Sequence, residues 1–322
     1  MKYLELDDGH KLDLPSRGAL PATVHVFDRD SVDAVNAALA AGRPLLVRGE
    51  PGTGKSQLAR AAADALGRAL VTTVIDARTE ARDLLWTFDA VTRLAEAQVQ
   101  GALPDRDEAA VRDSLRQERF LAPGPLWWTF DWQSAAGQAE KVAAVPPPSP
   151  DGWRPKDGTV LLIDEIDKAD AAVPNGLLEC LGEGRFGCPG GTEVARAAGA
   201  RPLVVITTNE ERALPDPFLR RCLVLQMRWP QETDDFVAAI IRRGRAHFPN
   251  CGDKVLEKAA RTLATDRERV GSTGLFPPGG AEYLDLLRAL LELAPGDEKK
   301  QLEVLGRIAR FVLDKHPAES PW

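Results

Sequence analysis

The residues best suited to chemistry form one short stretch, GEPGTGKS, from Gly49 to Ser56. Its spacing is G-x-x-x-x-G-K-[ST], and it lies between an apolar run and an alanine-rich run, as this motif requires. Glycines let successive backbone N–H groups turn inward around an anion, and the start of a helix adds partial positive charge. A chance lysine in a glycine-rich turn is the alternative, but it does not account for these flanks.

The chemistry of this stretch is the binding of a triphosphate with its metal ion. Lys55 is expected to reach the β- and γ-phosphates, and the Ser56 hydroxyl is expected to coordinate Mg²⁺. The predicted ligands are therefore ATP and Mg²⁺. The residues predicted to line the nucleotide are Glu50, Pro51, Gly52, Thr53, Gly54, Lys55, Ser56 and Gln57.

A pair of carboxylates, Asp164 and Glu165, ends the apolar run in VLLIDEIDKAD. A carboxylate at the carboxyl end of a buried strand lies beside the phosphate loop of an open α/β sheet. Asp164 is therefore predicted to hold Mg²⁺, and Glu165 to act as the general base that polarises water. A solvated acidic turn is the alternative reading. Asp167 and Asp170 are interpreted as solvated residues at a helix start.

Two further groups follow in the chain. Asn209 ends the apolar run VVITTN, where its amide could orient the same water without adding charge. Arg220 and Arg221 stand side by side in DPFLRRC, at the start of another apolar run. Adjacent arginines at that place suit an anion supplied from outside the subunit. The alternative is a pair of surface ion pairs, which contribute only ~0–1 kcal/mol.

The elements that must position these residues alternate between strand and helix. Apolar runs at 43–49, 69–76, 159–164 and 202–209 predict buried strands, and 55–67 predicts an amphipathic helix that ends at Gly67. This order predicts a parallel sheet with helices on both faces. From Pro230 onward helical patterns take over, at 232–246, 253–265, 280–294 and 298–314.

These patterns define the expected architecture. We expect an αβα sandwich of the P-loop NTPase type over residues 1–230, followed by an all-α lid over 231–322. An insert or loop is expected at about 124–158, where the sequence is rich in proline and glycine and carries four tryptophans. Trp127 and Trp128 are interpreted mainly as core residues, with a client-gripping loop as the alternative. The segment 106–119 reads as a short charged helix, and IIRRGR at 240–245 as a basic solvated face.

Taken in this order, the motifs resemble those of an AAA+ ATPase, and more narrowly of the MoxR branch. The resemblance rests on AVNAALAAGRPLLVRGEPGTGKSQLARAAADALG, LLIDEIDKADAAVPNGLLECLGEGRF and PLVVITTNEERALPDPFLRRC, over roughly 30–85 and 120–230. It implies a nucleotide domain, a helical lid, a ring of usually six subunits, and ATP-driven remodelling of a client. The family commonly works with a partner that carries a von Willebrand factor A domain.

The resemblance also implies roles for single residues. Asn209 corresponds to the first sensor, Arg221 to an arginine finger, and Arg220 to a second contact. Val26 and Phe27 fall where the family's adenine pocket has backbone contacts. The family's second sensor is a basic residue at the start of a lid helix, but here FPPGG stands at that place. The nearest candidates are Arg267, Arg269 and Arg288, and single substitutions of these are expected to have modest effects.

Composition narrows the functional classes. The 322 residues carry a net charge of −7, which argues against general binding to nucleic acid or to an anionic membrane. No apolar run approaches the ~20 residues of a membrane span, and the amino terminus lacks the apolar region of a signal peptide. Four scattered cysteines without a CxxC pair suit a reducing cytoplasm. Two alternatives remain: a nucleotide-gated assembly switch with little turnover, and a DNA-associated loader ATPase.

Overall fold

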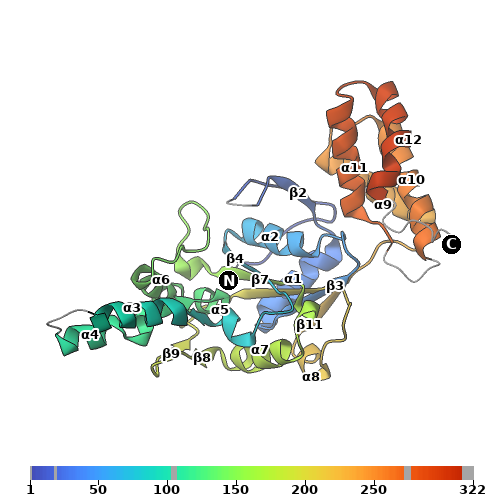
Figure 1. Ribbon diagram of the computed structural model, residues 1–322. Helices are drawn as coiled ribbons and strands as arrows, with labels where there is room; N and C mark the ends of the chain where they lie inside the picture. Colours follow the sequence, from blue (N-terminus) through green and yellow to red (C-terminus); the bar gives the residue numbers. More distant parts are fainter. Residues whose placement is uncertain (1, 18–19, 103–106, 272–276, 314–322) are drawn as a thin grey trace, which may run out of the picture. The chain divides into compact units, whose positions relative to one another are not determined.

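The computed structural model describes residues 2–17, 20–102, 107–271 and 277–313 (Figure 1). The chain falls into two compact units. The first unit consists of residues 1–5, 30–47 and 59–225, and the second of residues 6–29, 48–58 and 226–322. The predicted division at residue 230 stays a proposal, because the second unit also takes two segments from the amino-terminal part of the chain.

A five-stranded parallel sheet forms the centre of the first unit, in the order β11-β3-β10-β7-β4. Strand β7 pairs in parallel with both of its neighbours, so that Val160 lies opposite Leu70 on one side and Leu203 on the other. The four strands predicted at 43–49, 69–76, 159–164 and 202–209 are confirmed as β3, β4, β7 and β10, and β11 is the fifth strand of the sheet. Their bounds are β3 (Leu45–Gly49), β4 (Ala69–Val74), β7 (Thr159–Asp164), β10 (Leu203–Thr208) and β11 (Leu223–Met227).

Helices flank this sheet, as the alternating sequence pattern predicts. The α-helices are α1 (Arg29–Ala41), α2 (Lys55–Leu66), α3 (Ala90–Ala102), α4 (Glu108–Ser114), α5 (Pro125–Phe130), α6 (Trp132–Lys141), α7 (Ala172–Glu183) and α8 (Asp216–Leu219). Short 3₁₀ turns are η1 (Ala81–Leu84), η2 (Gln117–Phe120), η3 (Pro155–Asp157) and η4 (Ile166–Lys168). Two small antiparallel pairs complete the unit: β5 (Trp86–Phe88) with β6 (Leu121–Pro123), and β8 (Arg185–Gly187) with β9 (Glu193–Ala195).

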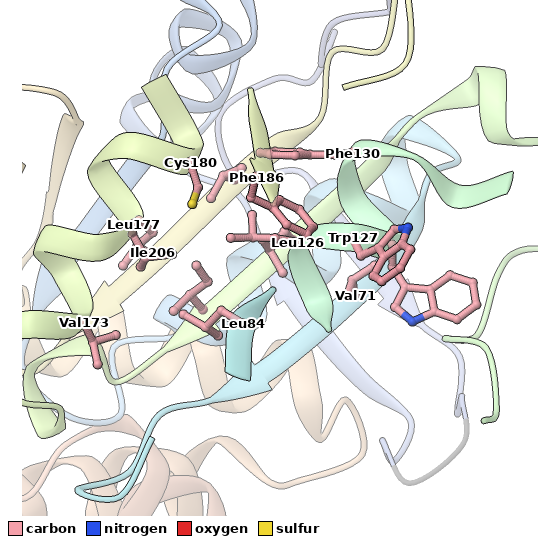
Figure 2. Packing of buried hydrophobic residues seen from close by; sticks show 14 of the residues in the cluster. Val71, Leu84, Leu126, Trp127, Phe130, Val173, Leu177, Cys180, Phe186 and Ile206 are labelled. Atoms are coloured by element: carbon pink, nitrogen blue, oxygen red, sulfur yellow. The ribbon is translucent and has the colours of Figure 1, made fainter. Parts of the chain in front are cut away.

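One face of the sheet is covered by an aromatic cluster. Trp127 and Trp128 are only 3% and 4% exposed, and they belong to a core that includes Leu161 and Ile163 of β7. Figure 2 shows Trp127, Phe130 and Phe186 among the apolar side chains of this cluster. The interpretation of these tryptophans as core residues is confirmed.

The long loop expected at 124–158 is only partly present. Residues 125–141 form α5 and α6 instead, and 142–158 contains only the short turn η3. Pro125 occupies the first turn of α5, where its missing N–H costs nothing, and Asp131 accepts a hydrogen bond from the backbone of Ser134 at the start of α6. Aromatic residues are weak helix formers, so burial against β4 and β7 is what stabilises α5.

The second unit is mainly helical. It contains a hairpin of β1 (Lys11–Leu14) and β2 (Thr23–Val26), with Lys11 opposite Val26. Its helices beyond residue 230 are α9 (Thr233–His247), α10 (Asp253–Gly271), α11 (Gly280–Leu293) and α12 (Glu298–Leu313), close to the predicted ranges. They enclose their own apolar core, in which buried Tyr283 donates a hydrogen bond to the carbonyl oxygen of Leu256 at 2.9 Å. In the described ranges, no helix combines the length and the apolar character that crossing a bilayer requires.

Candidate active site

The glycine-rich loop joins the end of β3 to the start of α2, which is the context predicted from the sequence. Gly52 and Gly54 have φ angles of 75° and 105°, which residues with a side chain rarely adopt. Lys55 is 7% exposed, and its ammonium group donates to the carbonyl oxygens of Gly49 at 2.8 Å and Glu50 at 2.9 Å. The lysine is thus held over its own loop, at the place where a phosphate chain would lie.

The remaining residues of the loop are fixed by local contacts. The Thr53 hydroxyl donates to the carbonyl oxygen of Glu50 at 2.9 Å, which closes the turn before α2. Ser56 is the second residue of α2, next to Lys55. The side-chain amide of Gln57 donates to the hydroxyl of Thr23 at 2.9 Å, so a nucleotide contact through that amide stays a prediction.

The predicted adenine contacts lie in the hairpin. Phe27 is fully buried, and its backbone N–H donates to the carbonyl oxygen of His10 at 2.9 Å. The carbonyl oxygen of Phe27 accepts from the N–H of Gly9 at 2.8 Å, and Val26 pairs with Lys11 in the sheet. These backbone groups therefore serve the hairpin itself, and an adenine contact at Val26 or Phe27 stays a prediction.

Arg243 of α9 is a residue at the phosphate loop that the sequence interpretation missed. Its guanidinium Nη1 donates to the carbonyl oxygen of Thr53 at 2.9 Å, and the guanidinium lies over the ring of Trp229, 5.6 Å from the centroid. Burial lowers the pKa of Arg243 to about 10, because the charged guanidinium has lost its water. The expected basic solvated face at 240–245 is therefore wrong for Arg243, although Arg242 is exposed. The only sequence signal was the cluster of arginines itself.

Glycines at the start of α11 face the same loop. A Cβ atom at Gly280 would lie 2.9 Å from the carbonyl oxygen of Gly52 and 3.1 Å from Nη1 of Arg243. A Cβ atom at Gly279 would lie 3.2 Å from the carbonyl oxygen of Pro51. The predicted position of the second sensor thus carries residues without side chains because the backbone of the phosphate loop approaches it closely. Phe276, the first residue of the FPPGG stretch, lies outside the described residues.

Arg267 supplies a second cation to the loop. Its guanidinium Nη2 lies 2.6 Å from Oε2 of Glu50, and the side chain is only 17% exposed. The other two candidates for the second sensor bind acidic residues of their own helices: Arg269 pairs with Asp266 at 2.7 Å, and Arg288 with Asp285 at 2.7 Å. Of the three arginines considered from the sequence, Arg267 is thus the one that the described contacts connect to the phosphate loop.

The predicted metal ligand and base lie together at the carboxyl end of β7. The Thr207 hydroxyl, on neighbouring β10, donates to Oδ1 of Asp164 and accepts from the backbone N–H of Glu165 at 2.9 Å. Glu165 adopts a left-handed conformation, with φ 61° and ψ 47°. Such a conformation costs a residue with a side chain about 1 kcal/mol or more, and it persists where the surroundings enforce it.

Asn209 lies beside the predicted base. Its side-chain amide donates to Oε1 of Glu165 at 3.4 Å, so the structure brings the predicted sensor and base together. The other oxygen of Glu165 accepts from the ammonium group of Lys168 at 2.6 Å, and this partner raises the pKa of Lys168. Both oxygens of the Glu165 carboxylate are therefore engaged, and Lys168 is a neighbour that the sequence interpretation did not identify.

Asp167 is buried, and its interpretation as a solvated residue is wrong. It is 2% exposed, and its Oδ2 accepts from the backbone N–H groups of Asn209 at 3.2 Å and Glu211 at 2.9 Å. These two hydrogen bonds tie the turn after β7 to the turn after β10. Asp167 thereby positions Asn209 relative to Glu165. Asp170, by contrast, is exposed and accepts from the N–H of Ala172 at 3.0 Å, as a residue at a helix start does.

Arg220 and Arg221 lie at the opposite edge of the sheet from the phosphate loop. They follow α8 and directly precede β11, so they stand at the amino edge of the parallel sheet, whereas the phosphate loop leaves the carboxyl end of β3. The side chains of Arg220 and Arg221 are both exposed. Arg43, just before β3, donates to the carbonyl oxygens of both residues, at 3.0 Å for Arg221. The arginine pair is therefore held by its backbone, with its side chains at the surface.

The residues present fit a magnesium nucleotide. The glycine-rich loop and the desolvated guanidinium of Arg243 suit a phosphate chain. The Ser56 hydroxyl and the Asp164 carboxylate are the hard oxygen ligands that Mg²⁺ prefers. With a parallel sheet in which β3, β10 and β7 are neighbours, these features define a P-loop nucleotide-binding fold.

Comparison with known families agrees with that class. The AAA domain family, in its dynein-related subfamily, matches residues 44–222, which is more than half of the chain. The chain therefore belongs to this family of AAA+ ATPases. No sequence match to a curated protein was found.

Among solved structures, the chain is similar to RuvB of Thermotoga maritima. For a mutant of RuvB in which a proline is replaced by glycine, the identity is 16%, the TM-score is 0.46, and the match covers 87% of this chain and 69% of that one. For a second RuvB mutant, with valine in place of a threonine, the identity is 15% and the TM-score 0.42, with 87% and 67% covered. The structure described as the RuvB Holliday junction branch migration motor has 15% identity and a TM-score of 0.41, with 87% and 67% covered.

Proposed function

We propose that this protein hydrolyses ATP with Mg²⁺ and, as a ring-forming AAA+ protein of the MoxR type, remodels or activates a partner protein complex. The observation that carries the hydrolytic part is the arrangement around Glu165. The Asn209 amide donates to the carboxylate of this glutamate, and the Thr207 hydroxyl, which also donates to Asp164, accepts from its backbone N–H. Together these contacts fix Glu165 at the end of β7 in a left-handed conformation. A general base needs this kind of positioning.

Each group then has a role that follows from its chemistry. Lys55, Arg243 and the backbone N–H groups of the glycine-rich loop bind the phosphates, and Ser56 and Asp164 hold Mg²⁺. When bound, the metal ion neutralises charge on the phosphates. Glu165 takes a proton from water, and Asn209 orients that water. Before Glu165 can act, its carboxylate must exchange the Lys168 contact for water, since that ammonium group lies 2.6 Å from Oε2.

The test of this function is steady-state hydrolysis by purified protein. Glu165→Gln should retain ATP binding and lose turnover, because an amide fits the same space but does not accept the proton. Glu183→Gln is the matched control, since Glu183 is an exposed glutamate at the far end of α7. Turnover by Glu165→Gln at the rate of the unmodified protein would show that the base is assigned wrongly.

The ring is proposed from the position of the arginine pair. We propose that these surface side chains, at the amino edge of the sheet, act on the nucleotide of a neighbouring subunit in a head-to-tail ring. An arginine finger of this kind contributes ~10³–10⁵ in rate. Glu165→Gln subunits would keep the arginine finger but lack the general base. Arg220→Ala/Arg221→Ala subunits would keep the general base but lack the finger. Mixing the two inactive variants should restore hydrolysis, and an inactive mixture that still co-assembles would refute the finger.

A nucleotide-gated switch with little turnover is the second candidate. The observation in its favour is the contact between Lys168 and Glu165, which occupies the predicted base. Steady-state hydrolysis by the assembled protein separates the two functions. A partner with a von Willebrand factor A domain belongs to the main proposal, and capture of ATP together with a partner by Glu165→Gln would support it. The four buried free cysteines suit a cytoplasmic location, which is also proposed.

A further inference from the structure

A cavity of about 330 Å³ lies at the amino edge of the sheet in the first unit. Its lining includes Pro44 just before β3 and Pro202 just before β10, so it is at the opposite edge from the strand ends that carry Asp164 and Glu165. A volume of this size is at the lower end of the range of small-ligand pockets. The cavity is thus separate from the candidate active site and needs its own account.

The charged residues that line this cavity are all basic. Arg43, Arg196 and Arg201 line it, and none of the described residues that line it is acidic. Arg68, which directly precedes β4, adds a fourth guanidinium nearby by donating to the carbonyl oxygen of Arg201 at 2.9 Å. Like charges that line one cavity repel one another, and an anion between them relieves that repulsion.

Arg196 is the least exposed of the three arginines that line the cavity. Its guanidinium lies over the ring of Phe130, 5.1 Å from the centroid, and Nη2 donates to the carbonyl oxygen of Leu181 at 3.4 Å. Its Nε is buried and finds no hydrogen-bond acceptor among the described residues. Burial also lowers the pKa of this guanidinium. A buried charged donor without an acceptor is rare in folded proteins.

Arg43 is held in place beside the same cavity. Two of its donors bind the carbonyl oxygens of Arg220 and Arg221, which fixes the guanidinium through the backbone of that turn. A guanidinium has five N–H donors in a planar fork, so donors remain for an oxyanion. The side chain is exposed, which leaves it accessible from solution.

We propose that this cavity is a binding site for a multivalent oxyanion of the phosphate class, such as pyrophosphate or a small phosphorylated compound. Three guanidinium groups match an anion with two or three negative charges better than a single carboxylate. The planar forks of Arg43 and Arg196 suit the paired oxygens of a phosphate group. Such a ligand would bring acceptor oxygens to the exposed guanidinium of Arg43.

The test uses pyrophosphate and the full chain, with Lys55→Ala in every sample to weaken binding at the phosphate loop. Isothermal titration calorimetry should show saturable binding in Lys55→Ala. Adding Arg43→Gln or Arg196→Gln should weaken that binding about tenfold or more, as expected for the loss of a charge-assisted hydrogen bond. Arg185→Gln is the control, since Arg185 pairs with Glu183 and Glu193 in the same unit. Its affinity should stay within about twofold of the Lys55→Ala parent, because a surface pair of this kind contributes little.

Thermal unfolding shows whether the variants fold. Arg43 is exposed, so Arg43→Gln keeps the test valid even if Arg196→Gln loses its packing on Phe130. Absence of saturable binding in Lys55→Ala would overturn the proposal. So would binding that Arg43→Gln leaves unchanged, because residual binding at the phosphate loop does not depend on Arg43. The measurement is of binding alone, so its outcome is independent of whether the protein hydrolyses ATP.

Discussion

Replacing Arg243 with glutamine should separate nucleotide affinity from the stability of the protein. The half-buried Arg243 donates to the carbonyl oxygen of Thr53 in the phosphate loop, and desolvation lowers the pKa of its guanidinium to about 10. A lowering of this size corresponds to a cost on the order of 3 kcal/mol for keeping the charge at this place. Such a cost is expected for a residue whose negatively charged partner is the phosphate chain of a bound nucleotide.

The expected effect follows from that cost. A hydrogen bond to a charged group contributes about 1.5–3 kcal/mol, so Arg243→Gln should weaken nucleotide binding by roughly 10- to 150-fold. Without nucleotide, the same variant should unfold at a temperature no lower than the unmodified protein, because a desolvated buried charge has been removed. The assays are a fluorescence titration with a labelled nucleotide in Mg²⁺, and thermal unfolding without nucleotide.

Arg242 provides the control, since it is the preceding residue of α9 and is exposed. Arg242→Gln should change neither the affinity nor the unfolding temperature appreciably. The reasoning would be refuted if Arg243→Gln bound nucleotide within about threefold of the unmodified protein while its unfolding temperature fell. Arg243 would then be a packing residue that supports the loop through Thr53 and Trp229.

Two further predictions concern the second unit. Arg267→Ala leaves the carboxylate of Glu50 without its partner at 2.6 Å, so nucleotide titration should show several-fold weaker binding, while Arg269→Ala should stay within about twofold. His25 is buried, and burial lowers its pKa to about 4 from 6.5. His25 therefore does not reduce the free energy of unfolding above pH 6.5. As the pH falls from 6.5 towards 4, the free energy of unfolding drops by up to about 3 kcal/mol, because the unfolded chain binds a proton that the buried histidine does not. Denaturant titrations should show a shallower loss over this range for His25→Phe, but not for exposed His10→Gln.

The parts of the fold that the sequence predicts are those specified by local pattern. The helical period in residues 232–314 places the boundaries of α9, α11 and α12 within one residue, because their apolar faces repeat regularly. The position of the Gly49–Ser56 loop between a strand and a helix is predicted equally well, because the motif lies in eight consecutive residues. Its contacts with a nucleotide stay a prediction. α10 extends beyond the predicted end at 265 to Gly271, where the sequence turns strongly charged.

What the sequence does not predict is burial that depends on distant segments. Asp167 looks like a helix-start carboxylate, and only the turn after β10 brings the N–H groups of Asn209 and Glu211 to it. Arg243 looks like one of three surface arginines, and only the folded unit brings Thr53, 190 residues earlier, to its guanidinium. In both cases the side chain is polar and its partner is backbone, so no pattern of apolar residues reports the contact.

The glycines at the start of α11 and the arginine on α9 are best understood as one arrangement. A Cβ atom at Gly280 would lie 3.1 Å from Nη1 of Arg243 and 2.9 Å from the carbonyl oxygen of Gly52. A side chain at 280 and the observed guanidinium of Arg243 therefore compete for the same space. An arginine at the start of the lid helix would have to displace Arg243 to reach the loop. The missing basic residue thus leaves room for a cation from α9, and the phosphate loop keeps a guanidinium contact through Thr53.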